Sequence, residues 1–224
     1  MTLSISSGET DSPPGRLIYR GAEADIIRGK WRGLDAVYKV RRLLSYRLAE
    51  LDASIRRQRT LHEAELTHLA RKAGVDVPRL YYIDASRTTL VMEYVTGLRL
   101  KEFVSSAPEE DVGDLFGALG RDTGRLHSSG ITHGDLTTAN VIVRDGELVF
   151  IDFGLANHSH RREDHAVDLR LIKETLVGAH VSISSMALHR FFGGYSDEVG
   201  AEQMKAVAGQ LRSIERRGRY ARLS

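Results

Sequence analysis

The chain has 224 residues, 42% hydrophobic and 28% charged, a composition that excludes a disordered tail and fits one compact domain or two small lobes. Its 32 Lys and Arg residues against 30 Asp and Glu residues leave a formal charge of +2, so any nucleic-acid role must come from a local patch. The absence of cysteine excludes disulfides, thiolate metal sites and thiol nucleophiles. No segment is long and apolar enough to span a bilayer, and we expect a cytoplasmic protein without membrane contact.

The N-terminal part of the chain predicts a small β lobe. Residues 1–15 are expected to be disordered, because they carry almost no apolar periodicity. Residues 16–95 open with three short β-prone runs separated by glycines, which predicts a small antiparallel sheet. Leucines at three- and four-residue spacings predict a helix over 41–73, and two further strands are expected at 80–84 and 88–94.

Residues 96–215 predict a helical, catalytic lobe. A helix is expected over 110–129, then a hairpin that turns at Asp145-Gly146, then helices from Asp168 onward. A mostly β lobe followed by a mostly α lobe predicts an α+β fold with a cleft between the lobes. The last nine residues, 216–224, are expected to form a mobile basic tail.

Two motifs in the second lobe point to phosphoryl transfer from ATP. Residues 133–140 read H-G-D-L-T-T-A-N, and residues 151–154 read I-D-F-G. Asp135 suits the carboxylate beside the attacking oxygen, whereas Asn140 and Asp152 suit ligands of Mg²⁺, with Mn²⁺ as the alternative ion. Aspartates are also common in turns, but the order and spacing of the two motifs disfavour that interpretation.

The first lobe supplies candidates for binding the nucleotide. Lys39 lies within an apolar strand and is the candidate for the phosphates; the alternative is an edge-strand lysine. Glu63 is the candidate for orienting Lys39, against the alternative of a solvated helix glutamate.

A kinase-type G-x-G-x-x-G loop is absent, and a single-glycine turn stands in its place. The residues of this turn are Gly21, Ala22, Glu23 and Ala24. The run that leads out of the lobe is where adenine would be read by backbone groups, and it holds Met92, Glu93 and Tyr94. The alternative for this run is a plain core strand followed by a linker.

Several stretches together resemble the small atypical kinase of the KEOPS complex, the PRPK type. They are residues 21–24, 59–64, 92–93, 126–140, 151–155, 163–169 and 217–219. The resemblance covers essentially the whole domain and implies a reduced, two-lobed protein-kinase fold that binds ATP with Mg²⁺. It also implies as partners the threonylcarbamoyl-transferring subunit, which modifies the adenosine next to the anticodon of certain tRNAs, and a small accessory subunit.

Two departures from ordinary protein kinases are visible. Gly134 stands where an arginine usually pairs with a phosphorylated loop, so we expect no control by loop phosphorylation. Only eight residues separate Gly154 from Glu163, and no A-P-E motif follows, so the platform for a peptide substrate should be much reduced. We therefore expect an atypical serine/threonine kinase or a partner-stimulated ATPase.

Other functions stay open at this point. A small-molecule phosphotransferase of the aminoglycoside or choline type also carries H-G-D-L, although it lacks the D-F-G motif and has a long C-terminal substrate region. A non-catalytic nucleotide-sensing scaffold is the third class. Basic residues gather in 41–59 and again in 205–222, and either group could be a solvated helix face. In the C-terminal tail we expect Arg216, Arg217, Arg219 and Arg222 to contact tRNA.

Overall fold

The structure, a computed structural model, describes residues 15–220, and the side chains of 218–220 are not described. The disorder expected for residues 1–15 therefore lies almost entirely outside the described residues. The chain divides into two compact units, one of residues 1–60 and 79–94 and the other of residues 61–78 and 95–224. The first contains a sheet and the second is mainly helical, which confirms the expected α+β class.

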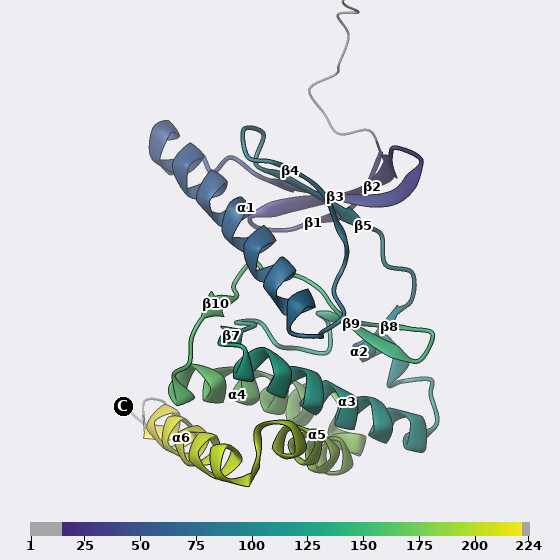
Figure 1. The fold of residues 1–224 in the computed structure, drawn as a ribbon, viewed down its shortest axis with the longest axis vertical. Helices are drawn as coiled ribbons and strands as arrows, with labels where there is room; N and C mark the ends of the chain where they lie inside the picture. Colours follow the sequence, from purple (N-terminus) through teal and green to yellow (C-terminus); the bar gives the residue numbers. More distant parts are fainter. Residues whose placement is uncertain (1–14, 221–224) are drawn as a thin grey trace, which may run out of the picture. The chain divides into compact units, whose positions relative to one another are not determined.

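A five-stranded antiparallel sheet forms the first unit (Figure 1). The strand order β1-β2-β3-β5-β4 places β3 at the centre, between β2 and β5. Ala36 and Tyr38 share one face of β3 and pack with Val91 of β5 in a small core. All five expected strands are present: β1 (Arg16–Arg20), β2 (Ala24–Trp31), β3 (Leu34–Arg41), β4 (Leu80–Asp84) and β5 (Thr89–Glu93).

Helix α1 (Ala49–Lys72) begins later than the expected residue 41. The backbone N–H of Arg41 still belongs to the sheet region, since it donates to the carbonyl oxygen of Thr88 at 3.1 Å. Three leucines that the spacing assigned to a buried helix face are exposed: Leu43, Leu48 and Leu51. The helical spacing of the leucines continues from the end of β3 through a turn, so it does not locate the residue at which the helix begins. Residues 61–78, expected in the first lobe, belong to the second unit.

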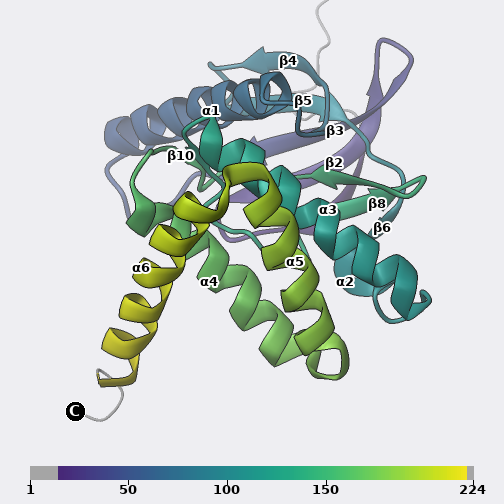
Figure 2. The ribbon, with the colours of Figure 1, turned by 60° about the horizontal axis from the view of Figure 1, so that its bottom comes forward.

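Helices make up most of the second unit (Figure 2). They are α2 (Leu100–Phe103), α3 (Glu109–Ser128), α4 (Arg162–Ala179), α5 (Ser184–Val199) and α6 (Ala201–Tyr220), with a 3-10 turn at Val181–Ile183. Two small sheets join β6 (Leu98–Arg99), β8 (Val141–Arg144) and β9 (Glu147–Phe150), and β7 (Ile131–Thr132) with β10 (Asn157–His158). The expected hairpin is confirmed as β8 and β9, whereas α4 begins at Arg162 and not at Asp168.

Helices α3 and α5 lie side by side, as Figure 2 shows, and their backbones approach closely at glycines. A Cβ atom on Gly120 of α3 would lie 2.0 Å from the carbonyl oxygen of Phe191 on α5. A Cβ atom on Gly194 of α5 would likewise lie 2.0 Å from the carbonyl oxygen of Gly117 on α3. Both distances are far below van der Waals contact, so this packing of the two helices requires glycine at both positions.

Helix α6 continues past residue 216, where the sequence predicted the start of a basic tail. Arginine is a good helix former, and two ion pairs attach this end of the helix to α4. Lys173 Nζ lies 2.6 Å from Glu215 Oε1, and Arg217 Nη2 lies 2.9 Å from Glu163 Oε1. The side chain of Arg219 and all of Arg222 lie outside the described residues.

Candidate active site

The loop between β7 and β8 holds Asp135 and Asn140 against each other. Asn140 Nδ2 donates to the Asp135 carboxylate at 2.8 Å and to the Asp135 carbonyl oxygen at 2.9 Å. The Asn140 backbone N–H donates to Thr137 at 3.0 Å, and the Asn140 carbonyl oxygen accepts from Ile151 at 2.9 Å. The structure therefore brings together the predicted base and one predicted metal ligand, and it closes the loop on itself.

Asp168 of α4 holds the start of this loop through hydrogen bonds to its backbone. Its carboxylate accepts the backbone N–H of His133 at 2.6 Å and that of Gly134 at 2.8 Å, and the residue is only 1% exposed. Burial acts to raise the pKa of Asp168, but the hydrogen bond and charge of His127, together with the hydrogen bond from the His133 backbone, outweigh burial and lower the pKa. The ionised carboxylate therefore holds the two residues that precede Asp135.

A buried network continues from Asp168 to α3 and α5. His127 Nε2 lies 3.2 Å from the Asp168 carboxylate, and His127 Nδ1 lies 2.9 Å from the hydroxyl of Tyr195. With Nε2 facing the carboxylate as a donor, Nδ1 and the Tyr195 hydroxyl pair with each other, so both ring nitrogens have a partner. The ring of His165 stacks on His127 at 4.2 Å, and burial, followed by the charge of His127, lowers the pKa of His165 to about 4.

His133 joins the two sequence motifs. Its Nε2 lies 3.2 Å from the carbonyl oxygen of Ile151 and must donate, while its Nδ1 accepts from the backbone N–H of Asp135 at 3.3 Å. Burial lowers the pKa of His133, consistent with this neutral form. The buried Phe153 ring packs on His133 with ring centres 4.9 Å apart. Asp152, between Ile151 and Phe153, is thereby held near the loop of Asp135.

Asp152 is exposed and has an unusual backbone. Its φ is +66°, a left-handed conformation that costs free energy for a residue with a Cβ atom, and Asp152 Oδ1 accepts the backbone N–H of Gly154 at 3.2 Å. Residues with such a backbone occur in turns, and they also cluster at active sites. The sequence identified Asp152 by its motif, whereas this backbone conformation emerges only from the structure.

The segment after Gly154 runs directly beside the loop. Gly134 has φ +77°, and a Cβ atom there would lie 2.1 Å from the carbonyl oxygen of Leu155. Two residues farther, β10 pairs with β7, with Asn157 opposite Thr132 and His158 opposite Ile131. The short connection from Gly154 to α4 is therefore a small strand pair in place of a longer loop.

The residues proposed to bind phosphate lie on the first unit. Lys39 stands on the central strand β3, between Ile26 of β2 and Leu90 of β5, and is buried. The loop between β1 and β2 closes through a bond from Gly21 N–H to the Ala24 carbonyl oxygen at 2.9 Å. Glu63, the predicted partner of Lys39, is buried on the part of α1 that belongs to the second unit.

The run predicted to read adenine ends the sheet. Met92 and Glu93 are on β5, opposite Val37 and Ala36 of β3, so the plain-strand interpretation describes their backbone correctly. Tyr94 follows them and donates its N–H to the Asp35 carbonyl oxygen at 3.2 Å. The guanidinium of Arg28 lies 3.8 Å from the centre of the Tyr94 ring, a cation–π contact that fixes the ring.

The donor set of the second unit fits a magnesium ion that arrives with phosphates. The side-chain amide nitrogen of Asn140 is directed at Asp135, so the amide oxygen points away from Asp135. The carboxylate of Asp152 is exposed to solvent. Within residues 15–220, His, Asp and Glu form no group of three or more able to hold a metal by themselves. Mg²⁺ in nucleotide sites takes one or two protein ligands and completes its shell with phosphate oxygens and water.

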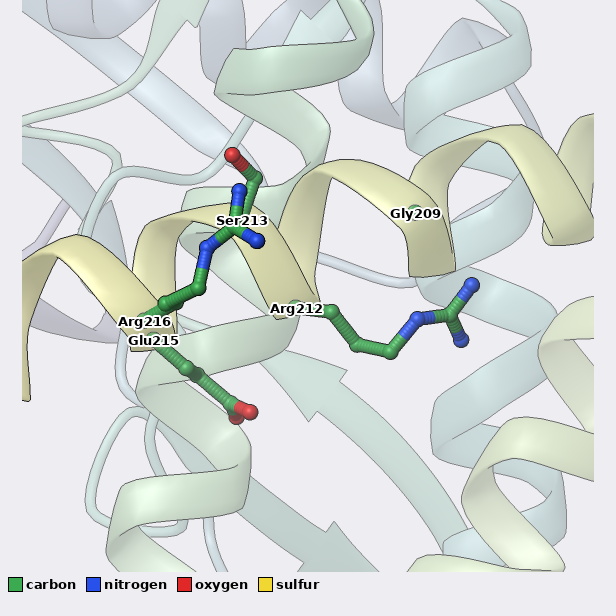
Figure 3. Close-up of a pocket in the computed structure, with 5 residues that line it drawn as sticks. All are labelled: Gly209, Arg212, Ser213, Glu215 and Arg216. Atoms are coloured by element: carbon green, nitrogen blue, oxygen red, sulfur yellow. The ribbon is translucent and has the colours of Figure 1, made fainter.

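A second candidate surface lies on α6, at an open hollow of about 440 Å³. Figure 3 shows the side chains of Arg212 and Arg216 extending from the helix, with the Glu215 carboxylate directed away from the Arg216 guanidinium. Glu215 itself pairs with Lys173 of α4. Two cationic side chains, one helical turn apart, thus border a solvent-open hollow.

Comparison with known proteins assigns the family. Residues 38–180 match the protein kinase domain family. KEOPS complex subunit Bud32 of Pyrococcus abyssi is 36% identical over an alignment that covers 92% of this chain and 96% of that protein. The chain belongs to the Bud32 family. The EKC/KEOPS complex subunit BUD32 of Yarrowia lipolytica, another member, is 37% identical over 91% of both chains.

Further comparisons are consistent with membership of the Bud32 family. A probable bifunctional tRNA threonylcarbamoyladenosine biosynthesis protein of Methanothermobacter thermautotrophicus is 39% identical over 92% of this chain, which spans 37% of that longer protein. The Rio2 kinase of Chaetomium thermophilum, solved with ADP and Mg²⁺, superposes with a TM-score of 0.63 at 20% identity, covering 92% of this chain and 70% of that one. This last similarity confirms the kinase-like fold expected from the sequence. No helix in the described part of the chain is long and apolar enough to cross a membrane.

Proposed function

We propose that this Bud32-family protein is an Mg²⁺- and ATP-dependent atypical serine/threonine kinase or partner-stimulated ATPase that supports threonylcarbamoylation of the adenosine next to the anticodon in tRNA. One observation carries the proposal. Asp135 and Asn140 are hydrogen-bonded to each other at 2.8 Å in a loop whose start is fixed by the buried Asp168. The matching relatives named as KEOPS subunits or tRNA threonylcarbamoyladenosine biosynthesis proteins support the pathway.

Each residue has a distinct role in the proposed reaction. Lys39 binds the phosphates and Glu63 orients it, while Asn140 and Asp152 bind the metal, which neutralises charge on the phosphates. Asp135 accepts the proton of the attacking hydroxyl or water.

The adenine and phosphate contacts come from the first unit in this proposal. Backbone groups of Met92, Glu93 and Tyr94 read the adenine edge, and the turn of residues 21–24 approaches the phosphates.

Two alternative functions are less well supported. A small-molecule phosphotransferase would not be expected to match KEOPS subunits over 92% of the chain. A non-catalytic scaffold would not need the hydrogen bond that orients Asn140 toward Asp135, nor a strained backbone at Asp152.

The metal role predicts the effect of Asp152→Ala. Mg-ATP affinity should fall at least about tenfold, because a hard cation loses one of its few protein ligands. Binding of ATP in EDTA should be unchanged, and fluorescence or calorimetric titration measures both. Asp197→Ala, which removes an exposed carboxylate from α5, is the matched control. Equal Mg-ATP affinity in Asp152→Ala and the wild type would contradict the assignment.

Partners complete the proposed activity. The helical unit is proposed to bind the threonylcarbamoyl-transferring subunit near residues 155–164, and the β unit a small accessory subunit. This assembly would act in the cytoplasm and make no membrane contact. Hydrolysis is therefore best measured both on the isolated chain and with the transferring subunit and tRNA present.

The basic end of α6 is the proposed tRNA contact. Replacing Arg212 and Arg216 together by glutamine should weaken tRNA binding and flatten its dependence on salt, by roughly 0.7 to 0.9 log units per lost phosphate contact. Arg170→Gln on α4, where the arginine pairs with Glu174 at 2.7 Å, is the control. Filter binding between low and high salt measures the slope, and an unchanged slope in the double variant would make this face an ordinary solvated helix surface.

A further inference from the structure

The turn between β1 and β2 is held by more contacts than its short sequence suggests. Besides closing on itself, it accepts two hydrogen bonds from Arg42, which follows β3. The Arg42 backbone N–H donates to the Glu23 carbonyl oxygen at 2.8 Å, and Arg42 Nη1 donates to the Gly21 carbonyl oxygen at 3.2 Å. A Cβ atom on Gly21 would lie 2.8 Å from the Ala24 carbonyl oxygen, so the turn is also tight.

The side chain at the tip of this turn is fixed as well. The Glu23 carboxylate lies 2.5 Å from Arg59 Nη1 on α1 and 3.7 Å from Arg41 Nη1 at the end of β3. The hydrogen bond from Arg59 is the main cause of the lowered pKa of Glu23, so the carboxylate is ionised at neutral pH. Arg41 Nη2 also donates to the Arg59 carbonyl oxygen at 3.5 Å. We call Glu23, Arg41, Arg42 and Arg59 the loop clasp.

The arginines of the clasp are packed against one another and against Glu23. The space among Glu23, Arg41, Arg59 and their neighbours on α1 is a cavity of only about 10 Å³. That volume is about what one ordered water needs, so the side chains enclose no cavity of ligand size. Asp52, which is buried, pairs with Arg56 at 2.6 Å and balances further positive charge beside the clasp. The partners that the structure gives these arginines include the Glu23 carboxylate and backbone carbonyl oxygens.

We propose that Arg59, with Arg41 and Arg42, is a positioning residue that keeps the Gly21–Ala24 turn ordered for nucleotide binding. The inference rests on the proposed function, because it assigns this turn to the phosphates. In a G-x-G-x-x-G loop the glycines let the backbone adapt to the phosphates. Here the backbone has one glycine, and ion pairs anchored on β3 and α1 provide the order before nucleotide arrives. Because the turn is already ordered in the folded protein, ATP binding does not have to supply the free energy of ordering it.

Arg59→Gln tests the proposal, with Arg57→Gln as the matched control. Arg57 lies on the same helix and is exposed, so its change removes equal charge without touching the clasp. In Arg59→Gln the amides of residues 22–24 should exchange with deuterium about fivefold faster without nucleotide, and the KM for ATP should rise about fivefold with kcat nearly unchanged. An ion pair of this exposure is worth on the order of 1 kcal/mol, which corresponds to that factor. Arg57→Gln should show neither effect.

A double-variant cycle separates positioning from a general loss of stability. If Arg59 acts through Glu23, the effect of Arg59→Gln on exchange and KM should largely disappear in a Glu23→Gln background. An undiminished effect in that background, or wild-type exchange rates in Arg59→Gln, would overturn the proposal. A wild-type chain that binds no Mg-ATP would instead refute the proposed function. Deuterium exchange of residues 22–24 without nucleotide would still test whether the clasp orders the turn.

Discussion

Asp135→Asn is expected to lower ATP hydrolysis and phosphoryl transfer at least about tenfold while leaving Mg-ATP affinity within about twofold. General-base contributions are typically on the order of a hundredfold or more, and an amide cannot accept the proton. The asparagine can still accept the hydrogen bond that Asn140 Nδ2 now makes at 2.8 Å, so the loop should keep its shape. The measurement is steady-state turnover, with the transferring subunit and tRNA present, alongside a binding titration.

Asp145→Asn is the matched control for this variant. Asp145 is exposed in the turn of the β8–β9 hairpin with φ +52°, a conformation that asparagine adopts readily. The same chemical change there should leave turnover unaltered. Wild-type turnover in Asp135→Asn would place the chemistry on another group and remove the main support for the proposed mechanism.

Gly194→Ala should destabilise the second unit by about 3 kcal/mol, the largest stability effect we expect from one added methyl group. The new Cβ atom would lie 2.0 Å from the Gly117 carbonyl oxygen, and backbone atoms on α3 can yield only if the helices separate. Separation of α3 and α5 would also stretch the contact between Tyr195 and His127. Chemical denaturation followed by circular dichroism measures the loss.

Gly193→Ala provides a neighbouring control on the same helix. No atom lies within 4 Å of the position that its Cβ would occupy, and the residue is exposed. Alanine there should therefore stabilise the protein by roughly 0.5–1 kcal/mol, because alanine is the better helix former. Equal effects of the two substitutions would show that the helices are not in contact at Gly194.

Much of the fold could be predicted from local patterns in the sequence. Period-two alternation and glycine punctuation located the five strands of the first unit, and the Asp145-Gly146 pair located a hairpin, because these signals depend on neighbouring residues. The start of α1 could not be predicted in this way. Leu43 and Leu48 continue a helical spacing across a turn, and only tertiary packing determines that both stay exposed.

In the candidate site, too, the sequence identified some residues and only the structure identified others. Asp135, Asn140 and Asp152 were identifiable because their spacing follows a motif, and the structure brings Asp135 and Asn140 into contact. The role of Tyr195 was not predictable, because the hydrogen bond that joins it to His127 connects residues 68 positions apart. Burial of a tyrosine on an apolar helix face suggests a core residue. Only the position of α5 beside α3 makes it part of the support of the loop.

The close approach of Gly134 to Leu155 limits how this protein could evolve. An arginine introduced at position 134 would need a left-handed backbone and would bring its Cβ atom within 2.1 Å of the Leu155 carbonyl oxygen. A single substitution therefore cannot install a phosphate-sensing cation beside Asp135. The segment after Gly154 would have to move as well, so control by a phosphorylated loop needs a change in that segment together with the new cation.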